Sequence, residues 1–213
     1  MSVRDIELEL YENLNSFFIG EGFELKKSLK QYRKTTASGF LNFIFSVSKS
    51  ADDFFLEVNF GVRVEAIEHI SQQFLDTLPA FQKETNTLII SIGKFNDNKY
   101  FRYRIANRED LKLTCKQVCQ FTLEQGLDFL SKNQSLNSID EVFNKKPHEP
   151  CKYLYNQTHR YFKGLVASKI NHNPKFVQLS EIYHQKLQAM KVPETTLTSY
   201  SSLANYLTYY SAN

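Results

Sequence analysis

Apolar and polar side chains alternate without interruption over residues 54–64. One side of this segment carries Phe54, Leu56, Val58, Phe60, Val62 and Val64, and the other side carries Phe55, Glu57, Asn59, Gly61 and Arg63. A two-residue period of this kind is typical of a β-strand with one buried face and one solvated face. Since the strands of parallel sheets are buried on both faces, the pattern predicts an antiparallel sheet that helices cover on one face only.

Weaker forms of the same pattern predict four more strands, at residues 23–34, 40–48, 88–92 and 99–106. Gly39 and the Ala51-Asp52-Asp53 segment are turn signals, so the first three strands along the chain are expected to form a meander. The Asn96-Asp97-Asn98 segment is expected to join the last two strands as a second hairpin.

Helical periodicity flanks these strands on both sides. The first predicted helix carries Ile6, Leu10, Leu14 and Phe17 and ends at the Gly20-Glu21-Gly22 turn. A second predicted helix carries Ile67, Ile70, Phe74 and Leu78 and stops at Pro79, and a long third one covers about residues 110–132 with Cys115, Val118, Cys119, Leu123, Leu127 and Leu130 on its apolar stripe. Three more helices are predicted at residues 153–170, 175–191 and 194–210.

These elements predict a two-layer α+β fold in the order α-βββ-α-ββ-α, with a five-stranded antiparallel sheet and helices on one face. The sheet domain is expected to cover residues 1–145, and a helical extension over residues 151–213 is expected to pack on it. Two prolines within Lys145-Lys146-Pro147-His148-Glu149-Pro150 break any helix, so this segment is the predicted linker.

Composition narrows the class of protein. A chain of 213 residues with 42% hydrophobic residues is long enough to bury a core, and its seven glycines argue against glycine-rich phosphate-binding loops. Three cysteines, an odd number, fit reduced thiols better than a disulfide framework. Neither a basic-then-apolar leader nor a run of roughly 18 apolar residues is present, so we expect a cytoplasmic protein without a membrane-spanning segment.

Part of the chain resembles a known family. The resemblance rests on Gly22–Lys27, the basic-aromatic Tyr32-Arg33-Lys34, and the segments Phe40–Ser50 and Phe55–Val62. Together they resemble the opening of a bacterial family known only as domain of unknown function 4304, over roughly the first 65 residues. The resemblance implies a fold and no activity.

Four side chains are candidate metal ligands. Cys115 and Cys119 are one helical turn apart, and His148 and Cys151 follow with a His-x-x-Cys spacing, so the four offer the ligand number of a tetrahedral zinc site. Against this, the two helix cysteines share a stripe with apolar side chains, where buried free thiols are common. We therefore expect core thiols, and no metal or cofactor.

A basic surface is the main candidate for function. If the alternation holds, the sheet face turned away from the helices carries Lys26, Lys30, Lys34, Arg63, Tyr100, Arg102 and Arg104. Such a face suits an acidic protein partner, and it also suits single-stranded nucleic acid through stacking and phosphate contacts, although the net charge is only +3. A plain solvated face with lysines that discourage edge pairing explains it too.

No catalytic signature stands out in the sequence. We therefore expect a non-enzymatic protein-binding module, in the manner of an immunity or inhibitor protein, with a nucleic-acid-associated protein as the alternative. An enzyme of unknown class stays open, because triad residues meet only in space. The pattern does not indicate an oligomeric state.

Overall fold

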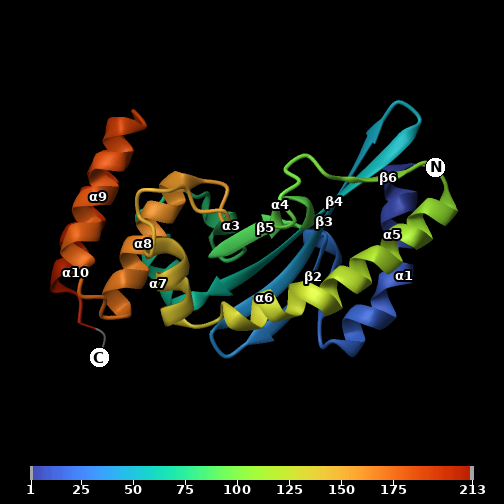
Figure 1. Ribbon diagram of the computed structural model, residues 1–213, viewed down its shortest axis with the longest axis horizontal. Coiled ribbons are helices and arrows are strands. Elements are labelled where there is room, and N and C mark those ends of the chain that lie inside the picture. The colour runs from blue at the N-terminus through green and yellow to red at the C-terminus, as the bar shows by residue number, and fades with distance from the viewer. Residues whose placement is uncertain (1, 212–213) are drawn as a thin grey trace. The chain divides into compact units, whose positions relative to one another are not determined.

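A computed structural model describes residues 2–211 of the chain, and it confirms the predicted α+β class with an antiparallel sheet (Figure 1). Contacts divide the chain into two compact units. The first unit comprises the chain up to Val62 together with Ile89–Lys132, and the second comprises Arg63–Leu88 and the chain from Asn133 onward. This division differs from the predicted one, since the segment after the long strand belongs with the C-terminal helices.

The first unit contains the sheet and the helices that cover it. Its elements are α1 (Val3–Gly20), β1 (Glu24–Lys26), β2 (Gln31–Thr36), β3 (Gly39–Ser50), β4 (Asp53–Val64), β5 (Leu88–Ser91), α4 (Ile92–Phe95), β6 (Tyr103–Ile105), α5 (Arg108–Phe121) and α6 (Leu127–Lys132). The ends of β4 and β5 run into the second unit. The strand order is β1-β2-β3-β4-β5, and β6 also pairs with β4. The predicted hairpin between residues 88–92 and 99–106 is therefore wrong, because both segments use β4 as their neighbour.

The segment predicted as one strand at residues 23–34 is a tight hairpin. A 3-10 turn at Lys27–Leu29 reverses the chain, and Lys30 closes the turn in the left-handed conformation with φ 51°. The register of β1 and β2 then pairs Lys26 with Gln31. The apolar alternation of this segment is imperfect at the same residues, which is where the strand breaks.

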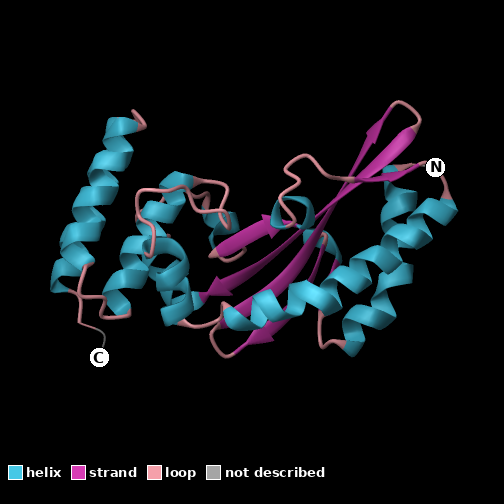
Figure 2. Ribbon diagram, viewed as in Figure 1, coloured by secondary structure: helices cyan, strands magenta, loops and turns pink. Residues whose placement is uncertain are grey.

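Helices of the first unit lie against one face of its sheet (Figure 2), and aromatic side chains form the core between them. Phe18 of α1 stacks on Tyr32 of β2 with ring centroids 4.4 Å apart. Phe43 of β3 stacks on Phe60 of β4 at 5.7 Å, and Phe60 in turn meets the edge of Phe121 of α5. The residues that alternate inward are therefore the ones that α1 and α5 bury, as the sequence predicts.

The long helix predicted at residues 110–132 is present, with one local change. Thr122–Gly126 forms a π-helical turn between α5 and α6. A π turn rotates the following residues about the helix axis, and Leu123, predicted on the apolar stripe, is 56% exposed. Gly126 occupies the buried side instead, where a Cβ atom would lie 3.2 Å from the ring of Phe43.

The second unit is helical. Its elements are α2 (Glu65–Ser71), α3 (Pro79–Gln82), α7 (Leu136–Asn144), α8 (Gln157–Ile170), α9 (Phe176–Ala189) and α10 (Glu194–Tyr209). The three predicted C-terminal helices are confirmed, whereas α2 ends well before Leu78 and α7 lies in a segment without a predicted element. All residues from Arg160 to Ser168 of α8 are buried, which makes α8 the central helix of this unit.

The predicted linker at residues 145–150 is held within the second unit. The Arg160 guanidinium donates hydrogen bonds to the carbonyl oxygens of Phe143 at 2.5 Å, Lys146 at 3.0 Å and Glu149. Lys186 Nζ donates to the His148 carbonyl at 2.9 Å. Arg160 and Lys186 therefore supply donors to carbonyl groups at and after the end of α7, which have no donor within the helix.

Gly164 of α8 provides a test of the packing of α8 on α7. An added Cβ atom would lie 2.9 Å from Asn144 Oδ1, which hydrogen bonds hold in place, and 3.3 Å from Phe143 Cβ. We expect Gly164→Ala to lower the free energy of unfolding by about 1 to 3 kcal/mol, although alanine is the better helix former. Urea denaturation followed by circular dichroism measures this change.

Gly20 of α1 is the matched control, because an added Cβ atom there meets nothing within 4 Å. Gly20→Ala is expected to leave stability unchanged or to raise it. Equal effects of the two substitutions would contradict the close approach of α7 and α8.

Candidate functional site

Lys30 and Lys34 do not belong to the predicted basic face. Lys30 Nζ lies 2.6 Å from Glu7 Oε1, and Lys34 Nζ donates a hydrogen bond to the Glu21 carbonyl at 2.9 Å. Both lysines therefore contact α1 or its C-terminal turn, on the side of the sheet that the helices cover. The prediction that they point away from the helices is wrong, because the chain reverses between Lys26 and Lys34.

Lys26 is exposed, and its ammonium lies 2.7 Å from the Glu24 carboxylate within β1. Exposed pairs of this kind contribute little to stability. In the register of β1 and β2, Glu24 is opposite Arg33, whose guanidinium lies 3.9 Å from the ring centroid of Phe40. Arg33, which is not among the residues predicted for the basic face, shares the outer face with Lys26.

Arg63 is buried in the second unit and is not available to a partner. Only 4% of the residue is exposed. Its guanidinium donates to the Glu65 carboxylate at 2.7 and 3.1 Å and to the carbonyl oxygens of Gln82 and Thr85 at 2.9 Å. The prediction that Arg63 faces water is wrong, because residues 82–85 lie against this side of β4 and their carbonyl groups accept hydrogen bonds from the guanidinium.

The remaining three predicted residues come together beside β4. Arg104 of β6 is opposite Phe55 in the strand register, and the Arg102 guanidinium lies 5.9 Å from the centroid of the Phe55 ring. Tyr100 is 83% exposed, and Lys99 Nζ lies 5.4 Å from its ring centroid. We call this surface the hairpin patch, and we define it by Phe55, Lys99, Tyr100, Arg102 and Arg104.

The hairpin patch lies where β6 and the loop before it pass the start of β4, beside the β3–β4 hairpin (Figure 1). Arg104 Nε is 2.6 Å from Asp53 Oδ2, and this hydrogen bond raises the pKa of Arg104. Within residues 2–211, Lys99 and Arg102 have no carboxylate partner. The patch therefore presents two cations beside an exposed aromatic ring.

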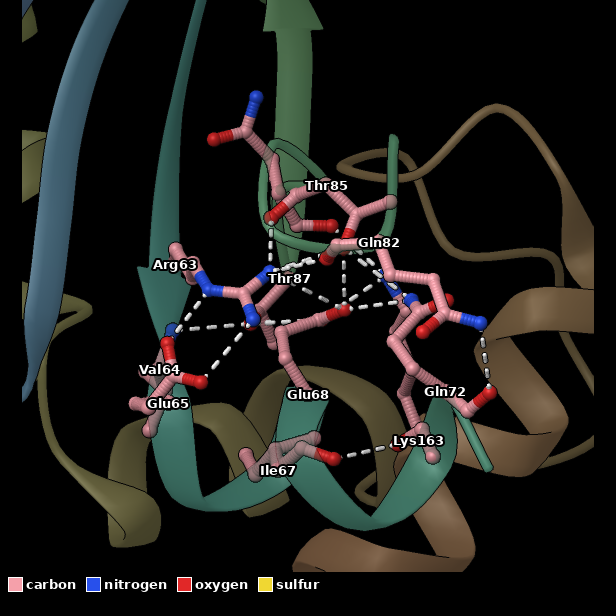
Figure 3. A network of polar contacts seen from close by, with 12 residues as sticks. Arg63, Val64, Glu65, Ile67, Glu68, Gln72, Gln82, Thr85, Thr87 and Lys163 are labelled. Carbon is pink, nitrogen blue, oxygen red and sulfur yellow. Dashed lines mark hydrogen bonds and ion pairs between the residues drawn. The ribbon is translucent and has the colours of Figure 1, made fainter. Parts of the chain in front are cut away.

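A buried polar network in the second unit surrounds an ion pair between Glu68 and Lys163 (Figure 3). Glu68 of α2 is 0% exposed, and its carboxylate lies 2.8 Å from Lys163 Nζ of α8. Lys163 Nζ also donates to the Asn86 carbonyl at 2.7 Å. Three further donors reach the two carboxylate oxygens at 2.8 to 2.9 Å: Gln72, Thr85 and Thr87.

The network stabilises the second unit and is not accessible to a ligand. Burial by itself raises the pKa of Glu68, but the charge of Lys163 and the hydrogen bonds outweigh it and hold the pKa below its usual value. The side chains of Glu68 and Lys163 are 0% and 2% exposed. The two residues belong to elements far apart in the sequence, so no local pattern predicts their pairing.

The candidate zinc ligands lie in different units. Cys115 and Cys119 are on α5 in the first unit, and His148 and Cys151 are in the second unit. Burial raises the pKa of Cys115 to about 12 and also raises that of Cys119, so both thiols are protonated at neutral pH. Between residues 2 and 211, no group of three or more His, Cys, Asp and Glu side chains is placed to hold a metal ion.

A groove of about 570 Å³ in the second unit lies at the N-terminal ends of α8 and α10. Its lining includes His159, Asp76 and Ser199. Burial is the main cause that lowers the pKa of His159, so its imidazole is neutral at pH 7. Within the described part of the chain, no hydrogen bond joins this imidazole to Ser199 or Asp76, so these three side chains do not form a triad here.

No protein family model, no curated protein and no solved structure matches this chain. The resemblance to domain of unknown function 4304 therefore stays a prediction. No helix in residues 2–211 has both the length and the apolar character that crossing a bilayer requires.

The Glu68–Lys163 pair provides a test of the second unit. Removing one partner leaves the other charge buried, so Glu68→Gln should lower the free energy of unfolding at pH 7 by about 3 to 5 kcal/mol. Because the pKa of Glu68 is lowered in the folded state, its contribution is present above the unfolded value of about 4.3 and is lost as the pH falls through the folded pKa. Urea denaturation at pH 7 and at acid pH measures both effects.

Glu141→Gln is the matched control, because Glu141 forms an exposed pair with Lys145 at 2.8 Å in the same unit. This control should cost no measurable stability. If Glu68→Gln is as mild as the control, or if its stability has the same acid dependence as the wild type, the buried pair does not stabilise this unit.

Proposed function

We propose that this protein is a non-enzymatic protein-binding module that recognises an acidic surface of its partner through the hairpin patch. One observation carries the proposal. The Tyr100 ring is 83% exposed in the loop before β6, with Lys99 near its ring and Arg102 beside Phe55 of the β3–β4 hairpin. Like an immunity or inhibitor protein, the module acts by covering part of its partner.

The residue types of the patch are those that contribute most to protein interfaces. Tyrosine and arginine are enriched among the residues whose truncation weakens a complex strongly. Tyr100 offers a large ring with a polar hydroxyl, and the Arg102 guanidinium is kept over Phe55, so little conformational entropy is lost when it binds a carboxylate. Lys99 and Arg102 supply the charge that attracts an acidic partner.

Single-stranded nucleic acid is the alternative partner, since bases also stack on exposed aromatic rings. The charge of the patch favours a protein. Asp53 already neutralises Arg104, and Asp97 lies in the same loop as Lys99. Phosphates along a strand require a longer run of unpaired cations than Lys99 and Arg102 provide.

The test is affinity capture from the native host, followed by measurement of the dissociation constant with the purified partner. Tyr100→Ala and Arg102→Glu should each weaken binding of an acidic protein by about 2 kcal/mol, which corresponds to roughly 30-fold. Tyr209→Ala is the matched control, because Tyr209 of α10 is also 83% exposed and should be neutral.

Two results would overturn the proposal. The first is a partner whose affinity is the same for Tyr100→Ala and Tyr209→Ala. The second is salt-sensitive binding of labelled oligouridine by fluorescence anisotropy that Arg102→Glu abolishes, which would assign the patch to nucleic acid.

A further inference from the structure

The open edge of β3 is a second feature of the hairpin, and no strand within residues 2–211 pairs with it. Residues 39–44 of β3 pair with β2, and the last contact on this side is the hydrogen bond from the Phe45 N–H to the Lys30 carbonyl at 2.9 Å. Beyond it, β3 continues to Ser50. In the described sheet, β4 is the only strand beside this part of β3.

The direction of the backbone groups follows from antiparallel geometry. In such a strand, the N–H and C=O groups of alternate residues point to the same side. Because the Phe45 N–H points toward the β2 side, the N–H and C=O groups of Val47 and Lys49 also point to that side, past the end of the pairing with β2. Those of Ser46, Ser48 and Ser50 point toward β4. Within residues 2–211, no hydrogen bond from another element reaches the edge groups of Val47 or Lys49.

This edge is accessible and is only lightly protected against pairing. Ser46, Ser48, Lys49 and Ser50 are exposed, and Val47 is half-buried. Natural edge strands are often blocked by proline, a bulge or a covering loop. Here Lys49 is the one charged side chain of the edge, and its ammonium lies 5.7 Å from the ring of Phe54.

The free N–H and C=O groups along the edge of β3 determine which backbone geometry a binding segment needs. Donors and acceptors that repeat every second residue along an extended backbone match another extended backbone. The charge specifies its chemistry, since Lys49 is the charged side chain of this edge and has no carboxylate partner within residues 2–211, which favours acidic side chains. A second copy of this edge fits less well, because antiparallel pairing about Ser48 brings the two Lys49 side chains to neighbouring positions on one face.

We propose that the partner adds an extended acidic segment to β3 as a new edge strand, through the N–H and C=O groups of Val47 and Lys49. This inference rests on the proposed function and names the part of the partner that the hairpin holds. Strand addition supplies backbone hydrogen bonds, and acidic side chains of the added strand lie beside Lys49.

The test uses a synthetic peptide that alternates Glu and Val, with binding followed by fluorescence anisotropy. Val47→Pro removes the edge N–H of Val47 and keeps the N–H of Ser48 for β4, and edge strands tolerate proline at such positions. We expect Val47→Pro to weaken binding roughly tenfold or more, whereas Val47→Ala binds as the wild type does. A peptide N-methylated at the residues that face β3 should lose binding to the same extent.

A second measurement does not depend on the folding of a variant. Addition of the peptide to the wild-type protein should shift the NMR amide signals of Val47 and Lys49 far more than those of Ser46 and Ser48. Equal binding by Val47→Pro and Val47→Ala, or equal binding of the N-methylated peptide, overturns the proposal.

The Arg102→Glu variant separates this proposal from the proposed function. If Arg102→Glu loses the natural partner while Val47→Pro retains it, strand addition fails and the hairpin patch stands. If both variants retain it, both proposals fail. Sedimentation equilibrium that shows a dimer in the wild type and a monomer in Val47→Pro would assign the edge to a second copy of the chain, which also overturns the proposal.

Discussion

Side chains along β3 and β4 alternate between a face that α1 and α5 cover and a face turned away from these helices, and the first unit depends on this alternation. Phe43 and Phe60 stack at the centre of the covered face, and the helices bury them. A shift of one residue in either strand would move these rings to the other face and remove the core. The same alternation determines the outer face, including Phe55, and the direction of the backbone groups at the edge of β3.

The second unit meets a different constraint, because its central helix buries two cations. Arg160 and Lys163 are each 1% exposed, and a buried charge is costly unless it is paired. Lys163 faces the Glu68 carboxylate, while Arg160 faces carbonyl groups at the end of α7. These contacts explain why the segment from Arg63 to Leu88 belongs to the same unit as α8, although about 75 residues separate Leu88 from Lys163.

The sequence predicts the parts of the fold that local periodicity governs, such as α1, β3, β4 and the C-terminal helices. The prediction fails where one residue or one turn changes which face the following side chains occupy. The left-handed Lys30 reverses a segment that reads as one strand, and the π turn before Leu127 moves Leu123 to the surface. Of the predicted basic residues, Tyr100, Arg102 and Arg104 come together because β6 pairs with β4. The prediction for Arg63 fails because the strand pattern does not show that residues 82–85 cover this side of β4.

The open strand and the proposed partner segment both depend on which residues of β3 direct their N–H groups to the free edge. Amide hydrogen exchange of the free protein, measured by NMR at single residues from Ser46 to Lys49, tests this assignment most directly. The account predicts fast exchange at Val47 and Lys49 and markedly slower exchange at Ser46 and Ser48. Slow exchange at Val47 and Lys49, or the reverse alternation, would contradict it.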